Sequence, residues 1–290
     1  FTPDPLFPTV AFPNPEEKGA LDLAFARARD VGADLIIAHD PDADRLAIAL
    51  PDSSSTSGYT SLTGNQVGAI LGWRAAEIAQ ATAQKGALAN SIVSSPWLGR
   101  IAQHFGLTHH ETLTGFKYVS RVPNLLFGFE EALGYLVDPR VVRDKDGISA
   151  AVAILDLANQ MAGRGKTLWD YLTVIEQSVG AYASGQITIK SDPTTADRPI
   201  TNRLRATPPT HIGDAAVTTA DDFLEGVESF PSDNILRYSL SDGSRVIVRP
   251  SGTEPKIKVY LDTAGETRAD AEAALAVLEA AVRQLLDSLP

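Results

Sequence analysis

Three aspartates at alternate positions, Asp40, Asp42 and Asp44, follow the apolar run Leu35–Ala38 with only His39 between. This run is bounded by turn-forming residues and predicts a buried strand. In an extended chain, residues i, i+2 and i+4 point to one side, so the three carboxylates are expected to converge. Three adjacent negative charges repel one another unless a cation lies among them, and Mg²⁺ prefers oxygen ligands of this kind. The segment therefore predicts a magnesium site with these three aspartates as ligands.

Two other kinds of site also use aspartates at this spacing. An EF-hand loop fails, because the sixth and twelfth positions counted from Asp40 hold Arg45 and Pro51 instead of glycine and glutamate. A phosphatase of the aspartyl-phosphate type also places an Asp-x-Asp pair after a buried strand, with the first carboxylate as nucleophile. That alternative, with Asp40 as the nucleophile, stays open. Arg45 can offset the surplus negative charge or hold a substrate anion.

A second loop, RPSGTEPK at residues 249–256, carries the donors that bind phosphate. It combines the guanidinium of Arg249, the hydroxyls of Ser251 and Thr253, backbone amides freed by Gly252 and the ammonium of Lys256. Charge-assisted hydrogen bonds of this type contribute about 1.5–3 kcal/mol each. A hairpin turn with an incidental arginine is the alternative. In a chain this acidic, the concentration of donors favours phosphate binding.

Two further segments carry weaker signals. Glu130 and Glu131 follow the apolar strand predicted over Leu125–Phe129, where α/β folds bind ligands beyond a strand's carboxyl end. Paired carboxylates there could accept hydrogen bonds from sugar hydroxyls, although such a pair is more often the start of a solvated helix. The segment 114–118 offers a turn glycine, an aromatic ring and Lys117, and is equally unspecific by itself.

Composition excludes several classes of partner. The 290 residues are 44% hydrophobic and 21% charged, which is typical of a globular protein long enough for two domains or more. A net charge of −11 argues against nucleic acid or an anionic membrane surface as a partner. No apolar run approaches the ~20 residues of a membrane span, and the lack of cysteine rules out disulfides and thiolate metal sites. We expect a cytoplasmic protein with no nucleic-acid or membrane partner.

Hydrophobic periodicity and turn residues predict the order of the elements. Before residue 59 we expect a helix over 16–29, strands over 35–38 and 46–50, and a flexible serine-rich link at 52–58. The alternation that follows predicts a mostly parallel sheet, with helices over 67–78, 98–105 and 148–161, strands over 92–94 and 125–129, and a loop at 113–118. The remainder predicts strands over 186–189, 215–218 and 235–240, a strand pair flanking 249–256, and helices over 194–205 and 268–286.

The ordered set of loops resembles a known family. HDPDADR (39–45), TGFKY (114–118), FEEALGY (129–135), DKDG (144–147) and RPSGTEPK (249–256) are similar to motifs of the α-D-phosphohexomutases, the phosphoglucomutase and phosphomannomutase superfamily. The resemblance covers nearly the whole chain, in the family's order. It implies an α/β fold class: mixed-sheet α/β domains and a smaller C-terminal α+β domain. The implied divisions are part of domain two at 1–58, domain three at 59–184 and domain four at 185–290.

The resemblance also implies roles for individual residues. Mg²⁺ would be held by Asp40, Asp42 and Asp44; sugar hydroxyls would contact Glu130, with Glu131 beside it; Lys145 would add positive charge near the substrate. The non-reacting phosphate would be held by Arg249, Ser251, Gly252 and Thr253, with Lys256 nearby. Arg45 and Lys117 match positions near the transferring phosphoryl group and are candidates for proton transfer or charge neutralisation.

One departure from the family is large. The family's serine loop, similar to Thr-Ala-Ser-His-Asn-Pro, does not occur in this sequence. The resemblance therefore implies the C-terminal portion of a mutase that acts on glucose or mannose 1- or 6-phosphate through a bisphosphate intermediate. Its phosphoserine would lie outside this chain, in N-terminal domains that would be its partner, and the chain alone would be inactive. The alternatives are the phosphatase described above and a non-catalytic phosphosugar-binding fragment.

Overall fold

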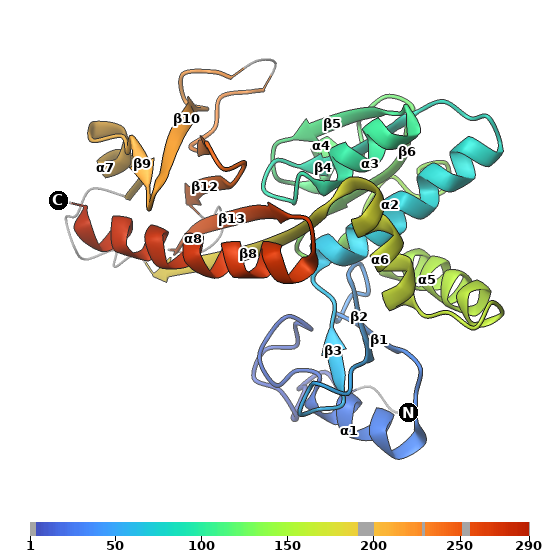
Figure 1. Cartoon of the computed structure of the whole chain (residues 1–290). Coiled ribbons are helices and arrows are strands. Elements are labelled where there is room, and N and C mark those ends of the chain that lie inside the picture. The colour runs from blue at the N-terminus through green and yellow to red at the C-terminus, as the bar shows by residue number, and fades with distance from the viewer. Residues whose placement is uncertain (1–3, 191–199, 228–229, 251–255, 290) are drawn as a thin grey trace. The chain divides into compact units, whose positions relative to one another are not determined.

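The computed structural model describes residues 4–190, 200–227, 230–250 and 256–289. The chain divides into two compact units, residues 1–175 and 176–290. The first runs from blue to yellow-green in Figure 1 and the second from there to red. Among the described residues, no helix combines the length and the apolar character needed to cross a lipid bilayer.

The first unit begins with helix α1 (Asp22–Val31) and an antiparallel sheet of order β1-β2-β3. The strands are β1 (Ile36–His39), β2 (Leu46–Pro51) and β3 (Tyr59–Ser61). The helix predicted from residue 16 starts six residues later, because the chain before it forms turns and Gly19 has a φ of 85°, outside the helical region. Gly32, in the left-handed conformation, ends the helix.

The serine-rich segment 52–58 is a hydrogen-bonded hairpin turn and not a loose link. Pro51 pairs with Tyr59 across it, and the Asp52 amide donates to the carbonyl oxygen of Gly58 at 2.9 Å. The Asp52 carboxylate accepts from the hydroxyls of Ser54 and Thr60, each at 2.6 Å. These two hydrogen bonds lower the pKa of Asp52 to about 2. Ser54 therefore donates one of the hydrogen bonds that hold this turn.

A mixed four-stranded sheet of order β5-β4-β6-β7 forms the centre of the first unit. Its strands are β4 (Ala87–Ser91), β5 (Thr108–Thr112), β6 (Leu125–Glu130) and β7 (Gly134–Leu136). β4 pairs in parallel with β5 and β6, whereas β7 is antiparallel to β6, which confirms the mixed α/β class. The strand predicted over 92–94 is wrong in position: β4 ends at Ser91, and Ile92 and Val93 lie buried in the turn that follows, where the Ser94 amide donates to the carbonyl oxygen of Ser91 at 3.0 Å.

Helices cover both faces of this sheet. The helices that pack against its strands are α2 (Gly64–Ala81), α3 (Trp97–Phe105), α4 (Phe116–Val119) and α5 (Gly147–Ala162). Helix α6 (Leu168–Val179) instead joins α2, where the Tyr171 hydroxyl donates to Glu77 at 2.6 Å. A Cβ at Gly68 would lie 2.5 Å from the ring of Phe129, so α2 packs closely on one face of β6. A Cβ at Gly128 would lie 2.5 Å from Val119 of α4, on the opposite face. β6 is therefore enclosed between α2 and α4.

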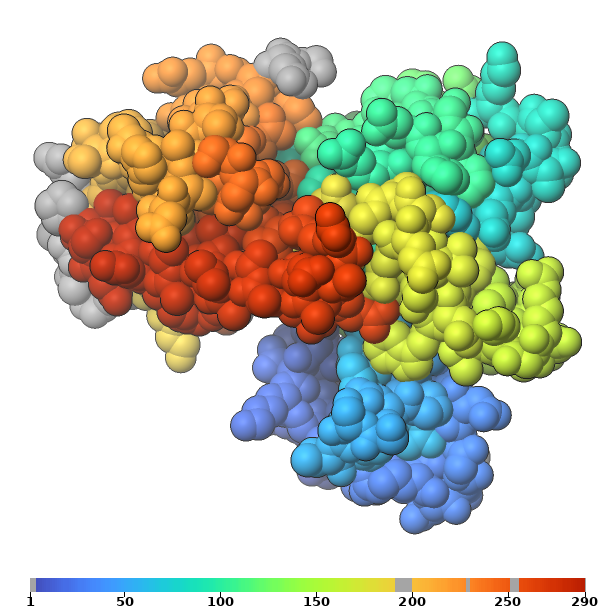
Figure 2. Space-filling model, in the orientation of Figure 1, coloured from blue at the N-terminus to red at the C-terminus, as the bar shows by residue number. Residues whose placement is uncertain are grey.

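The second unit is a six-stranded antiparallel sheet of order β8-β13-β12-β11-β10-β9. Its elements are β8 (Ala181–Lys190), α7 (Ile200–Ala206), β9 (His211–Ile212), β10 (Ala215–Asp222), β11 (Leu236–Leu240), β12 (Arg245–Pro250), β13 (Lys256–Gly265) and α8 (Arg268–Ser288). Thr267 and Asp270 form a capping box at the start of α8. Leu278 and Val282 of α8 pack into the core of the sheet, and the other side of the helix is exposed (red in Figure 2).

Candidate metal centre and sugar-phosphate loops

The three aspartates cluster as the sequence predicts, but through a different backbone geometry. One carboxylate oxygen from each of Asp40, Asp42 and Asp44 lies within 4.8 Å of the others. The chain between β1 and β2 is not extended: the Ala43 amide donates to the carbonyl oxygen of Asp40 at 3.0 Å, and Ala43 has a φ of 56°. A tight turn, and not strand alternation, therefore brings the carboxylates together.

The donor set fits a hard divalent cation. Octahedral Mg²⁺ holds oxygens at about 2.0–2.1 Å, which places opposite ligands roughly 4.2 Å apart. Neighbouring ligands lie closer, at about 2.9 Å, so the aspartate oxygens, which lie within 4.8 Å of one another, would draw together around the ion. Asp40 is buried, Asp44 is partly buried and Asp42 is exposed, so the cluster is open to solvent on one side. Such a site could accept both water and a substrate oxygen.

Arg45 orients the buried aspartate. Its backbone amide donates to Asp40 Oδ1 at 3.0 Å, and its Nε donates to Asp40 Oδ2 at 2.6 Å. Burial raises the pKa of Asp40, but the hydrogen bonds and the positive charge of Arg45 outweigh it and hold that pKa below its ordinary value. Asp40 is thus kept ionised and fixed in direction. Arg45, predicted to lie near the transferring phosphoryl group, is placed beside the cluster.

A later segment of the first unit supports the aspartate loop. The amide of Leu46 donates to the carbonyl oxygen of Leu133 at 3.0 Å, and Arg45 forms a β-bridge with Gly134. The amide of Gly147 donates to the carbonyl oxygen of Ala43 at 3.1 Å. The FEEALGY and DKDG segments therefore join the aspartate loop through backbone hydrogen bonds.

Lys145 contacts the aspartate loop directly. Its Nζ lies 2.5 Å from Oδ2 of Asp44, and each of these side chains is 29% exposed. Burial lowers the pKa of the Lys145 ammonium, but the hydrogen bond and the charge of Asp44 raise it overall. The lysine that the family resemblance places near the substrate is thus an ion-pair partner of one candidate metal ligand.

The two adjacent glutamates have different surroundings. Glu130 Oε1 accepts a hydrogen bond from the amide of Gly115 at 2.6 Å, which joins the FEEALGY and TGFKY loops. Glu131 Oε2 accepts from the hydroxyls of Ser94 at 3.0 Å and Ser91 at 3.3 Å, both buried. Glu131 is directed toward the sheet, so it anchors the loop, whereas Glu130 lies at the junction of two candidate sugar-binding loops.

The remaining candidates lie apart from the aspartate cluster in the chain. Lys117, on α4, is exposed, and its Nζ lies 4.9 Å from the centroid of the Tyr118 ring. In the second unit, Arg249 belongs to β12 and Lys256 begins β13, and both are partly buried. Ser251, Gly252 and Thr253 fall outside the described residues. Two cations therefore border the predicted phosphate loop on adjacent strands.

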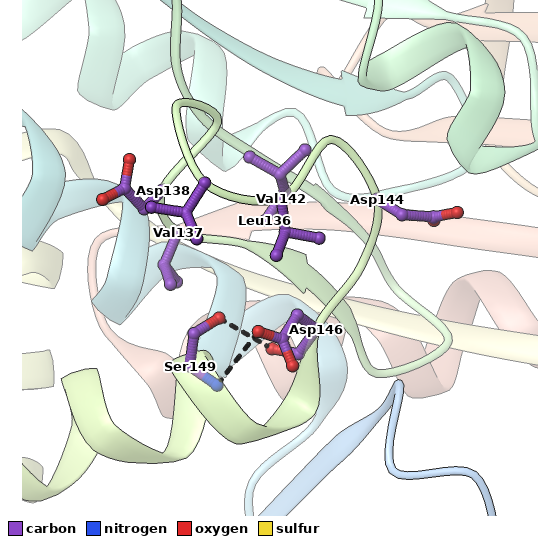
Figure 3. A pocket seen from close by; sticks show the side chains of 8 residues that line it. Leu136, Val137, Asp138, Val142, Asp144, Asp146 and Ser149 are labelled. Carbon is purple, nitrogen blue, oxygen red and sulfur yellow. Dashed lines mark hydrogen bonds between the residues drawn. The ribbon is translucent and has the colours of Figure 1, made fainter.

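A small hollow lies where the chain turns from β7 into α5 (Figure 3). Asp146 caps the helix there, accepting from the amides of Ile148 at 3.1 Å and Ser149 at 3.4 Å. The hollow is lined by Leu136, Val137, Asp138, Val141, Val142, Asp144, Asp146 and Ser149. Its lining includes none of the candidate metal ligands, so it reflects the packing of the loop and is not the site.

Three further positions, to which the sequence alone assigned no role, shape the site; His39 and Gly147 belong to the motifs HDPDADR and DKDG. His39 Nδ1 lies 2.8 Å from the carbonyl oxygen of Arg45. Ser94 both binds the carboxylate of Glu131 and accepts from its amide at 3.0 Å. A Cβ at Gly147 would lie 2.4 Å from the carbonyl oxygen of Arg45. Of the three, only Gly147 could be noticed from local sequence, as a glycine at the start of a predicted helix. The contacts of all three are made with residues outside their own local pattern, so their roles could not be predicted.

Models of one protein family match three consecutive stretches of the chain. They are phosphoglucomutase/phosphomannomutase α/β/α domain II at residues 1–53, α/β/α domain III at residues 63–179 and the C-terminal domain at residues 210–280. The chain belongs to the phosphoglucomutase/phosphomannomutase family. It is 51% identical over 284 residues to a protein of Haemophilus influenzae named as a probable phosphomannomutase, covering 98% of this chain and 57% of that protein.

Other comparisons agree with this family. A phosphoglucomutase of Staphylococcus aureus is 34% identical over 281 residues, which cover 89% of this chain and 50% of that protein. The crystal structure of pp63/parafusin, a phosphoglucomutase from Paramecium in an open form, matches with a TM-score of 0.72 at 22% identity, over 95% of this chain and 50% of that one. The latter likeness concerns the fold. The chain spans about half the length of the curated relatives it matches.

Proposed function

We propose that this chain is the metal-binding and substrate-binding part of an Mg²⁺-dependent phosphohexomutase. The observation that carries the proposal is the cluster of Asp40, Asp42 and Asp44, whose oxygens lie within 4.8 Å of one another. Arg45 and Lys145 contact that cluster, as a site for a metal and a phosphoryl group requires. Relatives named phosphomannomutase and phosphoglucomutase support the reaction class.

The proposed reaction moves a phosphoryl group from a phosphoserine outside this chain to a glucose or mannose monophosphate, and returns the other phosphate of the bisphosphate to the serine. The bound metal supplies neutralisation of the charge that develops on the phosphoryl oxygens. Arg45 keeps Asp40 ionised and oriented. Glu130 accepts hydrogen bonds from sugar hydroxyls, beside the anchored Glu131, and Lys117 is the candidate for proton transfer.

The second unit is proposed to hold the phosphate that does not react. Arg249 and Lys256 supply positive charge on adjacent strands, and Ser251, Gly252 and Thr253 supply hydroxyl and amide donors. A phosphatase with Asp40 as nucleophile is less well supported, because the relatives are named as a phosphomannomutase and a phosphoglucomutase. Mass spectrometry for a phosphate on Asp40 distinguishes the two reactions.

The proposed activity is tested with two preparations. A polypeptide of the relatives' length that contains this chain is expected to interconvert glucose 1-phosphate and glucose 6-phosphate, or the mannose phosphates, in the presence of Mg²⁺. The 290-residue chain alone is expected to show no turnover, because its sequence lacks the serine loop. A coupled assay measures both. Turnover by the purified chain alone, or none by the longer polypeptide, would contradict the proposal.

Arg249→Ala is expected to weaken sugar-phosphate binding by about tenfold or more, since a charge-assisted hydrogen bond contributes about 1.5–3 kcal/mol. The melting temperature should change little, because Arg249 is not part of the buried core. Calorimetry with glucose 1-phosphate and glucose 6-phosphate measures the affinity.

Arg283→Ala provides the matched control for this measurement, because Arg283 lies on the exposed part of α8 and pairs with Glu279 of the same helix. It should bind both sugar phosphates as the parent chain does. If Arg249→Ala and Arg283→Ala bind the two sugar phosphates equally well, Arg249 does not contribute to sugar-phosphate binding.

A further inference from the structure

Two cations compensate the three aspartates, and each has its own partner. Arg45 Nε lies 2.6 Å from Oδ2 of Asp40, whereas its distance to Oδ1 of Asp44 is 3.9 Å. Lys145 Nζ lies 2.5 Å from Oδ2 of Asp44. Lys145 reaches the cluster from the segment before α5, about a hundred residues later in the chain. The two cations can therefore respond differently to a metal ion.

Arg45 is fixed to Asp40 by its backbone as well as its side chain, because its amide also donates to that carboxylate. Lys145 has a fixed backbone, but its four-carbon side chain is flexible. Its neighbours on both sides are held: the amide of Asp146 donates to the carbonyl oxygen of Tyr135 at 2.9 Å, and that of Gly147 donates to Ala43. The ammonium at the end of the side chain can leave Asp44 without any change in the backbone.

We infer that Lys145 is a resident counter-ion that competes with the divalent cation for Asp44. This inference rests on the proposed function and adds a control on its metal affinity. A divalent ion at the aspartates needs an oxygen of Asp44 and repels the ammonium that lies 2.5 Å from that carboxylate, so the metal and Lys145 compete for Asp44. The displaced ammonium keeps its charge and becomes available to an anionic substrate oxygen.

Competition and simple support predict effects of opposite sign. If Lys145 only held the loop in shape, its removal would loosen the cluster and weaken metal binding. If Lys145 competes with the metal, its removal leaves Asp44 with uncompensated charge and strengthens metal binding. The sign of the change in affinity therefore separates the two roles, and it is read without any enzymatic activity.

The test is calorimetric titration of the 290-residue chain with Mn²⁺ as the probe, at constant ionic strength. Lys145→Met and Lys145→Gln are expected to lower the dissociation constant for Mn²⁺ by about threefold to fivefold, the upper part of the range expected for losing one partly exposed ion pair. Lys145→Arg keeps the charge and should remain within about twofold of the parent chain. Lys85→Met, which removes an exposed lysine elsewhere in the first unit, should have no effect.

Two results would overturn the inference. Unchanged or weaker Mn²⁺ binding by both neutral variants, with circular dichroism and melting showing that at least one is folded, would make Lys145 a support of the loop. An increase in affinity that Lys85→Met reproduces would make the effect one of net charge. If neither the parent chain nor any variant binds Mn²⁺, the metal assignment in the proposed function fails, and the competition fails with it.

Discussion

Asp40→Asn is expected to weaken divalent-cation binding by about a hundredfold or more. Asp40 is the buried member of the cluster, and both of its oxygens are oriented by Arg45. The amide removes the negative charge and places an NH₂ group or a neutral oxygen against a guanidinium, so a ligand and its orientation are lost together. Titration with Mn²⁺ or Mg²⁺ measures the loss.

Asp42→Asn gives the graded comparison for this prediction. Asp42 is exposed, so its substitution should weaken metal binding by a smaller factor than that of Asp40. Asp30→Asn, an exposed aspartate on α1, should leave the affinity unchanged. Parent-like affinity in both Asp40→Asn and Asp42→Asn would show that the cluster is only an acidic turn.

Gly147→Ala is expected to lower the free energy of unfolding of the first unit by about 2–4 kcal/mol, through overpacking and a lost hydrogen bond. The added methyl carbon would lie 2.4 Å from the carbonyl oxygen of Arg45, 2.7 Å from Nδ1 of His39 and 2.8 Å from the carbonyl oxygen of Ala43. Two of these atoms are backbone, so α5 or the aspartate loop must move. Urea unfolding measures the change, and metal binding should weaken with it.

Gly163→Ala is the matched control, at the other end of the same helix. Its φ is −60°, and the nearest atom to an added Cβ is at 3.5 Å, an ordinary contact. Its effect on stability should be small and of either sign. If Gly147→Ala unfolds at the same urea concentration as Gly163→Ala, the close approach of α5 to the aspartate loop is not tight in solution.

Local sequence predicted the elements with strong periodicity or clear ends. β2, α3, α5 and α8 lie within a few residues of their predicted ranges, because apolar spacing and caps are properties of neighbouring residues. β5 was not expected. Its sequence, THHET, is polar because its side chains are partly exposed, and it is held as a strand by pairing with β4. Pairing between distant segments leaves no mark in a local pattern.

In the candidate site too, local sequence predicted some features, whereas others depend on backbone conformation or on distant segments. The types of ligand could be predicted from Asp40, Asp42 and Asp44, but the turn that gathers them depends on Ala43 adopting a positive φ. The ion pair of Lys145 with Asp44 joins segments about a hundred residues apart. The family resemblance placed that lysine near the substrate, but its partner could be seen only in the structure.

The hydrogen bonds from Gly147 to Ala43 and from Leu46 to Leu133 cross the border between the stretches matched by domains II and III of the family. The candidate metal centre therefore includes residues from both sides of the boundary between domains II and III of the family models. A chimaera that exchanged residues 1–53 between relatives would combine the aspartate loop with foreign partners for these two hydrogen bonds. To inherit the metal affinity of its donor, such a chimaera would have to carry residues 133–147 as well.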